Sequence, residues 1–299
     1  MKKQITSNRG ALIKGAVFAG AFALLTSTAI AADAAAASGP AKPAGAHDAD
    51  AIAKKLANPI AAMISIPFEE NFDWGGGPDG DGFQWKQNFQ PVIPFTINED
   101  WNLITRAIIP YVHQSDVGGT KGNKSGSQTG FTDTTVSAWL SPAKPTAGGW
   151  ILGAGLAANL PTGSETGLTS NQWALGPTAI ALRVQGKFVY GALVNHLSSV
   201  TGTGGNDRLR VNNTYMQPFF AYLPGGGITY SANLESSYNW NAPDGDREWT
   251  VPVNLMISKM SKIGKFPVQY RAGVRYYITA PKNGPEAGMR LAVTFLLPK

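Results

Sequence analysis

The sequence predicts an all-β fold, a closed antiparallel up-and-down transmembrane β-barrel of about twelve strands with a short N-terminal helix. Three observations lead to this prediction. Apolar and polar residues alternate in one segment after another, short and long connections alternate along the chain, and tryptophans stand at the segment ends. Outer-membrane barrels combine these features, because their outward side chains contact lipid while their inward side chains line a polar lumen.

Residues 1–31 have the features of a cleaved secretory signal peptide. Lys2, Lys3, Arg9 and Lys14 form a positive region, residues 15–25 are mostly apolar, and small residues at 29–31 offer a cleavage site. The apolar run is too short for a spanning helix, so we exclude this segment from the fold. Its removal leaves 21 basic against 19 acidic residues, a net charge of about +2 instead of +6. That balance does not favour a nucleic-acid partner.

The composition limits the classes of protein to which the chain can belong. The chain has no cysteine, which excludes disulfides, thiol catalysis and cysteine metal sites. No later apolar run is long enough for a membrane-spanning helix. The 35 glycines and 20 prolines are typical of many short strands joined by turns. A soluble β-sandwich and a membrane barrel both fit these counts.

Residues 32–62 are expected to form a flexible periplasmic leader that contains a short helix. The stretch up to His47 is rich in Ala, Gly and Pro. Asp48 or Asp50 is expected to cap a helix that runs to about Asn58 and ends at Pro59. The helix either rests on or plugs the mouth of the barrel, or the segment is an unstructured tail.

Residues 63–299 are expected to form the barrel. The clearest alternation is at the C-terminus, where Met289, Leu291 and Val293 are apolar and Arg290 and Thr294 are polar. Glu70 interrupts the apolar face of the first strand, which a bulge would explain. The predicted strands are 63–74, 83–95, 101–113, 131–140, 150–160, 173–185, 188–200, 211–223, 228–240, 249–258, 267–278 and 289–297. An even count lets the last strand pair with the first, so that no edge is left in lipid.

Three features favour the barrel over the sandwich. Long connections at 115–130, 161–172, 201–210 and 279–288 alternate with short ones such as 98–100 and 186–187, although 141–149 is longer. Charged residues fall on the polar faces of the strands. Indole favours the membrane interface, because it joins an apolar body to a polar N–H. The predicted interface girdle therefore consists of Trp74, Trp85, Trp101, Trp139, Trp150, Trp173, Trp240 and Trp249.

Several stretches resemble a known bacterial family. They are LANPI at 56–60, PVIP at 91–94, NEDWNLI at 98–104, LGPT at 175–178, YGALVN at 190–195, WTVPV at 249–253 and VTFLLPK at 293–299. Together they resemble the outer-membrane family labelled putative MetA-pathway of phenol degradation, or putative transporter. The resemblance extends from about Leu56 to the C-terminus. It implies an outer-membrane barrel and uptake of small compounds, aromatic ones among them, and it brings no catalytic residues.

The lumen is the candidate site. Arg271, Arg275 and Arg290 form a basic stripe on the last hairpin, and the hairpin register is expected to place Arg290 near Tyr277. The stripe either favours anionic solutes, or the arginines pair with lumen acids across the closing seam, where Glu69 or Asp73 meets Arg290. The lumen-lining candidates are Lys86, Arg106, Arg271, Arg275, Arg290, Glu69 and Asp73.

Other motifs are read as structural. The two Asp-Gly-Asp stretches at 79–81 and 244–246 fit turns better than a cation site, so no metal or cofactor is expected. His196 and Ser198 lack a third catalytic group, so neither a catalytic residue nor an enzyme is expected. His113 is expected to be structural as well. Lys121, Lys124, Arg208 and Arg210 are expected in outer loops, beside surface glycolipid phosphates or simply in solvent.

The predicted function is passive transport or binding of small solutes in the outer membrane of a Gram-negative bacterium. The alternative is a structural or surface-interaction barrel that its own ion pairs and N-terminal helix plug. The expected partners are outer-membrane lipid, surface glycolipid and a small-molecule solute. Twelve strands favour a narrow lumen, because eight strands are filled by side chains and sixteen leave an open channel.

Overall fold

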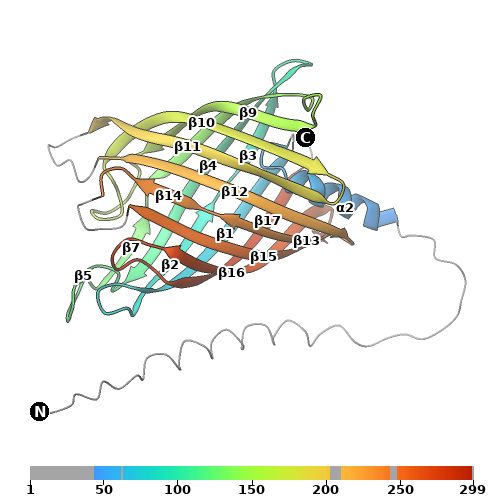
Figure 1. The fold of residues 1–299 in the computed structure, drawn as a ribbon. Coiled ribbons are helices and arrows are strands. Elements are labelled where there is room, and N and C mark those ends of the chain that lie inside the picture. Colours follow the sequence, from blue (N-terminus) through green and yellow to red (C-terminus); the bar gives the residue numbers. More distant parts are fainter. Residues whose placement is uncertain (1–43, 62, 203–209, 243–247, 298–299) are drawn as a thin grey trace, which may run out of the picture. The chain divides into compact units, whose positions relative to one another are not determined.

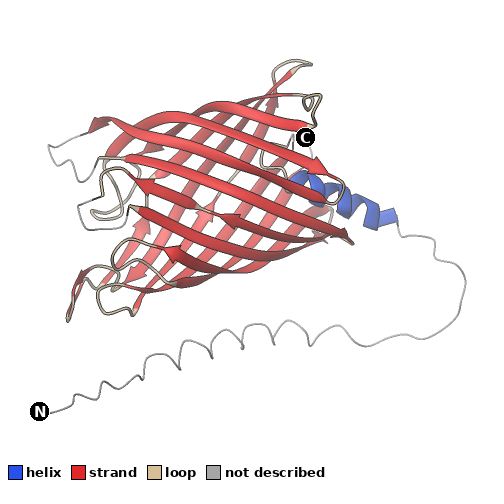
Figure 2. Ribbon diagram, viewed as in Figure 1, coloured by secondary structure: helices blue, strands red, loops and turns tan. Residues whose placement is uncertain are grey.

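A single closed β-barrel accounts for most of the chain in the computed structural model, which describes residues 44–61, 63–202, 210–242 and 248–297. One antiparallel sheet closes on itself, and one helix lies at one end of it (Figures 1 and 2). The predicted signal peptide and the leader up to residue 43 lie outside the described residues. No helix within the described ranges is long and apolar enough to cross a membrane.

The barrel wall has twelve strand positions, as the sequence predicts. We call each position a stave, and three of the staves are built from two strands each. The helix is α2 (Ala44–Leu56), and β5 (Gly119–Thr120) and β6 (Asn123–Lys124) form a small separate hairpin. The wall consists of β1 (Ile64–Gly76), β2 (Gly82–Phe89), β3 (Val92–Thr96), β4 (Trp101–Ser115), β7 (Ser127–Phe131), β8 (Thr134–Pro142), β9 (Trp150–Leu160), β10 (Gln172–Gln185), β11 (Phe188–Gly202), β12 (Asn212–Gly225), β13 (Ile228–Leu234), β14 (Ser236–Asn239), β15 (Trp249–Ile263), β16 (Phe266–Thr279) and β17 (Ala287–Leu297).

The split staves have a local cause. The predicted strand 83–95 is interrupted at Pro91, which has no N–H to give to the ladder. The backbone adapts around the break, since the Gln90 N–H donates to the Pro67 carbonyl and the Ala107 N–H to the Pro91 carbonyl. The stave made of β7 and β8 breaks opposite Pro110, whose carbonyl accepts from Thr132.

The first and last strands close the barrel, which confirms the predicted seam. β1 and β17 pair antiparallel in unbroken register from Ile64 opposite Leu297 to Trp74 opposite Ala287. β11 pairs with β12 on the other side of the molecule, so the sheet has no free edge. A spanning sheet needs this closure, because lipid offers no partner to an exposed backbone amide.

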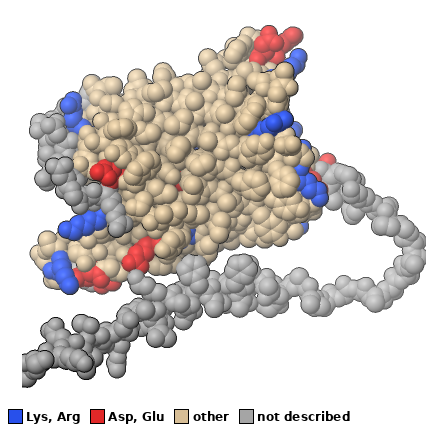
Figure 3. Space-filling model, viewed as in Figure 1, with Lys and Arg blue, Asp and Glu red and all other residues tan. Residues whose placement is uncertain are grey.

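Side chains alternate between the lumen and the outside as the sequence predicts. In β17, Arg290 exposes 3% and Thr294 3% of their surface, whereas Leu291 between them exposes 40%. In β15, Asn254 is fully buried and Leu255 is 55% exposed. Charged side chains on the face in Figure 3 gather mainly near the two ends, and the middle is largely uncharged.

Glu70 does not cause a bulge, so that expectation is wrong. It sits in regular register between Gln87 of β2 and Leu291 of β17, and the register shift of this hairpin lies between Trp74 and Gly76. Its carboxylate accepts hydrogen bonds from Trp85 Nε1 at 2.7 Å and Gln87 Nε2 at 2.8 Å. Two donors on the neighbouring strand thus compensate for a carboxylate on the outer face.

The connections differ in length between the two ends of the barrel. At the end that carries α2, β10–β11, β12–β13 and β15–β16 are joined by two-residue turns at 186–187, 226–227 and 264–265. The other end carries the longer loops, among them 116–126, 161–171 and 280–286 (Figure 1). The connection 143–149 is the longer exception that the sequence also indicated.

The helix begins earlier than predicted, and its expected cap is wrong. α2 starts at Ala44, so neither Asp48 nor Asp50 stands at its N-terminus. Asp50 instead links the helix to the barrel, because its Oδ1 accepts a hydrogen bond from the Gly227 N–H of the β12–β13 turn at 2.6 Å. Gly227 has φ +70, a conformation that a glycine adopts without strain.

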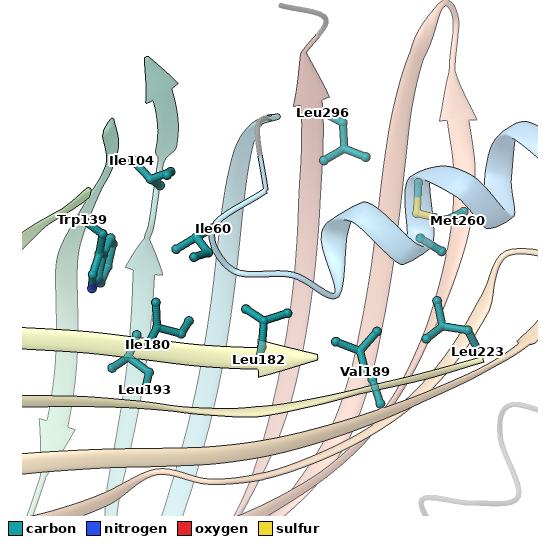
Figure 4. Close-up of a cluster of buried hydrophobic side chains, with 12 residues drawn as sticks. Ile60, Ile104, Trp139, Ile180, Leu182, Val189, Leu193, Leu223, Met260 and Leu296 are labelled. Atoms are coloured by element: carbon teal, nitrogen blue, oxygen red, sulfur yellow. The ribbon is translucent and has the colours of Figure 1, made fainter. Parts of the chain in front are cut away.

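The segment formed by α2 and residues 57–61 closes the mouth of the barrel. Ala53 and Ile60 expose 1% and 4% of their surface and belong to one apolar cluster with inward side chains of the wall. Figure 4 shows Ile60 on the coil after the helix, facing Trp139, Ile180 and Leu182. Burial of these side chains stabilises the segment in place, at roughly 25 cal/mol per Å² of apolar surface. The segment is therefore packed against the barrel and is not a free tail.

Candidate functional site in the barrel lumen

A polar cavity of about 660 Å³ occupies the lumen beside the apolar plug. Residues of the plug segment, Lys55 to Met63 among them, line one side of it. Inward side chains of the wall line the rest, and they include both charges and aliphatic groups. The charged wall residues are Glu69, Lys86, Arg106, Asp133, Glu235, Arg271, Arg275 and Arg290.

Arg290 stands at the centre of the ionic network. Its guanidinium makes a bidentate pair with Glu235, with NH1 2.6 Å from Oε1 and NH2 2.9 Å from Oε2. Its Nε donates to Asn71 Oδ1 at 2.7 Å, and its NH2 lies 3.4 Å from Glu69 Oε1. Fork-to-fork pairs of this kind are among the stronger ionic contacts in proteins.

Arg275 extends the same network toward the loop end of the barrel. It donates through NH1 to Asn71 Oδ1, so this one amide oxygen joins both arginines. Its Nε lies 3.5 Å from Asp73 Oδ1, and its NH2 lies 3.7 Å from Glu235 Oε2. Its NH2 also donates to the Tyr277 hydroxyl at 3.1 Å. We call Glu69, Asn71, Asp73, Glu235, Arg275 and Arg290 the seam cluster.

The structure resolves the alternatives left open for the basic stripe. Arg275 and Arg290 pair with lumen acids, and Glu69 meets Arg290 as the closing seam predicts. Asp73 meets Arg275 rather than Arg290. The register expected for Arg290 is wrong, because it lies opposite Gly273 and not near Tyr277.

The sequence analysis did not predict Glu235 as a lumen residue, although Glu235 binds Arg290 more closely than any predicted acid does. It lies between β13 and β14, where the backbone of Glu235 donates to the Pro252 carbonyl. A signal was present in the sequence. Thr229, Ser231 and Asn233 mark the inward face of this stave, and Glu235 follows at the next inward position.

The other three basic candidates differ from the seam cluster. Lys86, Arg106 and Arg271 line the cavity, yet within the described part of the chain none has an acidic partner within ion-pair distance. Arg271 donates through NH2 to Gln269 at 3.1 Å, and Arg106 stacks over the Trp139 ring at 5.3 Å. Five cations thus share the lumen with three paired acids.

Trp139 does not belong to the interface girdle, so that prediction is wrong. It exposes 1% of its surface and points into the lumen, where its Nε1 donates to Thr178 Oγ1 at 3.1 Å. Gly153 of β9 lies in the same cluster, where a Cβ would stand 2.9 Å from Ile180 Cγ2. Trp85 is half-buried on the outer face. The six remaining candidates expose between 38% and 58% of their surface: Trp74, Trp101, Trp150, Trp173, Trp240 and Trp249.

The described residues contain no group of three or more His, Cys, Asp or Glu side chains that could hold a metal ion. Asp79 accepts from the Gly122 N–H, which joins two loops, and Gly80 after it has φ +76, as a turn requires. The second Asp-Gly-Asp stretch, at 244–246, lies outside the described residues.

The histidines and loop cations show no catalytic geometry among the residues described. The His113 ring contacts Thr129 Oγ1 at 2.7 Å, and the His196 ring contacts Thr214 Oγ1 at 2.9 Å rather than Ser198. Lys121 and Arg210 are exposed in the loops. Lys124 lies in β6, and Arg208 lies outside the described residues.

Asp133 organises the loop at 161–171. Its Oδ1 accepts from the Gly163 N–H at 3.1 Å and Thr169 Oγ1 at 2.6 Å, and its Oδ2 accepts from the Ser170 N–H at 2.8 Å. The loop is therefore held against the β7–β8 stave. Replacement by alanine would leave these donors without their acceptor.

We expect Asp133→Ala to loosen this loop while the barrel stays folded. A protease that cuts after glutamate should cleave after the exposed Glu165 at least tenfold faster than in the parent protein. Asp79→Ala is the matched control, because Asp79 supports a different pair of loops. Equal cleavage rates in Asp133→Ala and the parent would contradict the role of Asp133.

Comparisons with known proteins agree with this architecture. The family model described as Putative MetA-pathway of phenol degradation matches residues 72–195. The resemblance seen in the sequence is confirmed. The match to the phenol-degradation family covers β2 to β10 and the beginning of β11, as well as part of β1. No curated protein sequence matches the chain.

One solved outer-membrane structure shares this fold. An outer membrane channel from Pseudomonas putida F1 aligns with a TM-score of 0.61 and 16% identity, over 79% of this chain and 96% of that one. The KdgM porin aligns with a TM-score of 0.41 and 9% identity, over 79% and 99%. Outer membrane phospholipase A from Escherichia coli aligns with a TM-score of 0.41 and 14% identity, over 78% and 92%. At these identities the likeness concerns the fold.

Proposed function

We propose that the protein is an outer-membrane channel for small solutes, aromatic compounds among them, and that α2 and the coil after it close its periplasmic mouth. The observation that carries the proposal is the polar cavity inside a closed barrel, beside a plug that, among the described residues, is attached by apolar packing and by the hydrogen bond from Gly227 to Asp50. A barrel built only as a structural element has no need of such a cavity. The family match and the fold shared with a bacterial outer membrane channel support the proposal.

The localisation follows from the same proposal. Residues 1–31 direct export and are cleaved, and 32–43 form a periplasmic leader before the plug. The uncharged outer face contacts outer-membrane lipid, and exposed tryptophans lie at its two rims. Lys121 and Arg210 lie in the loops, where they would meet the phosphates of surface glycolipid. We propose no enzymatic activity, because the His196 ring contacts Thr214 Oγ1 rather than the candidate nucleophile Ser198.

Displacement of the plug tests the channel. Ala53 is buried in the apolar cluster, so an arginine there cannot be accommodated and should release the helix. We expect the full-length parent to show no steady conductance in planar bilayers and Ala53→Arg to show open channels. Lys54→Ala, on the same helix but exposed, is the control and should stay closed.

A solute assay separates transport from mere leakiness. Liposomes that contain Ala53→Arg should swell in phenol, benzoate and small neutral sugars faster than empty liposomes. If Ala53→Arg folds, as its heat-dependent mobility in SDS gels would report, and neither conducts nor admits solutes, the barrel is structural and the channel proposal fails.

A further inference from the structure

We propose that the lumen cavity contains a binding site for a small organic carboxylate with an apolar body, and that Arg106 and Arg271 are its anchors. The inference rests on the proposed function in one respect, namely that solutes reach the lumen. It adds the class of solute and the residues that select it.

The first argument is that two buried arginines each have one guanidinium nitrogen, Nε, without an acceptor. Arg106 Nε and Arg271 Nε are both inaccessible to water at the barrel wall, and neither has a hydrogen-bond acceptor among the described residues. A buried donor without an acceptor costs about 1–3 kcal/mol, and more when the group is charged. Both side chains line the cavity, so a bound anion would offer acceptors to these under-satisfied guanidinium groups.

The second argument is the charge balance of the lumen. Glu235 and Glu69 are engaged by Arg290, and Asp73 by Arg275, so the acids of the seam cluster are occupied. Arg106, Arg271 and Lys86 remain as positive charge around the cavity, against the single carboxylate of Asp133, which is hydrogen-bonded to the loop at 161–171. Arg106 comes from β4 and Arg271 from β16, and both line the same cavity.

The third argument is the chemistry of the remaining cavity wall, which sets the body of the ligand. Val92, Ile108, Leu197 and Val211 contribute aliphatic surface, and Tyr215 contributes an aromatic ring. Inorganic anions gain nothing from such walls. The volume of about 660 Å³ lies in the usual range for small-molecule sites, roughly 300–1,000 Å³. A ring or short chain that carries one carboxylate matches both parts of the cavity.

Calorimetric titration of the full-length protein in detergent micelles tests the site with three probes. Benzoate carries the charge and the apolar body, benzamide is its neutral counterpart, and inorganic phosphate has charge without the body. We expect benzoate to bind at least tenfold more tightly than either of the other two. Equal affinity for benzamide, or for phosphate, would overturn the proposed ligand class, as would the absence of benzoate binding.

Substitutions assign the anchors. Arg106→Gln and Arg271→Gln should each weaken benzoate binding at least tenfold, and Arg271→Lys should recover part of the loss because it restores the charge. Lys262→Gln removes the same charge at an exposed position outside the cavity and should bind benzoate as the parent does. Unchanged benzoate binding in folded Arg106→Gln and Arg271→Gln would overturn the assignment.

The outcome of this binding test is independent of the outcome of the channel test. If Ala53→Arg does not conduct but the parent binds benzoate through these arginines, the binding site stands and the channel falls. If Ala53→Arg conducts but benzoate does not bind, the channel stands and the site falls.

Discussion

Arg290→Met is expected to lower the free energy of unfolding by about 3–5 kcal/mol, the usual loss when one member of a buried ion pair is removed. Glu235 would lose both of its short hydrogen bonds, and Glu69 would lose its cation. Methionine fills much of the volume, so the lost charge rather than a void would dominate the effect. Denaturant unfolding in micelles, followed by tryptophan fluorescence, measures it.

Two variants make the Arg290 prediction specific. Arg271→Met removes an arginine of the same lumen that has no acidic partner among the described residues, and it should cost less than about 1 kcal/mol. The double variant Arg290→Met with Glu235→Gln should recover part of the loss, because no unpaired carboxylate remains at Glu235. A loss in Arg290→Met no larger than that in Arg271→Met would contradict the central place of Arg290 in the seam cluster.

Gly288→Val is expected to destabilise the barrel by about 1–3 kcal/mol, as overpacking does. Gly288 lies on β17 directly between Asp73 of β1 and Arg275 of β16. A side chain there would overlap the Asp73 carboxylate and stand 2.6 Å from the Phe72 carbonyl oxygen. The backbone cannot yield without loss of the seam register, so the ion pair between Asp73 and Arg275 must open.

Ala287→Val is the matched control for Gly288→Val. It adds bulk at the neighbouring position of the same strand, on the outer face, where lipid can adapt. Thermal melting of both variants in the same detergent should show a lower midpoint for Gly288→Val alone. If both variants melt like the parent, the close packing around Gly288 does not constrain the seam.

The periodicity of the sequence predicts the barrel well because lipid imposes a simple rule on every strand. Alternation along β15 and β17 places each side chain on the correct face, and the even number of staves implies the closing pair. Glu69 could be matched to Arg290 because the two strands are neighbours across the seam. Strand register predicts contacts between residues on adjacent strands, but it does not predict contacts across the lumen.

The errors of the sequence analysis lie where contacts cross the lumen. Glu235 binds Arg290 from a stave that does not adjoin β17, so no strand register relates them. Trp139 points inward and donates to Thr178 of β10, which its position at a strand end does not indicate. Asp50 binds the turn at Gly227, 177 residues away, and a local capping rule cannot foresee that contact.

The seam between β1 and β17 has a consequence for biogenesis. Asn71 and Arg290 are 219 residues apart in the chain, so the network they share forms only when the ring is complete. A barrel arrested one strand short would expose two unpaired strand edges to hydrocarbon and leave several charges of the lumen without partners, which is a costly state. Assembly is thereby made all-or-none. The chain has no cysteine, so no disulfide joins the first and last strands, and the ion pairs and hydrogen bonds of the seam cluster link them instead.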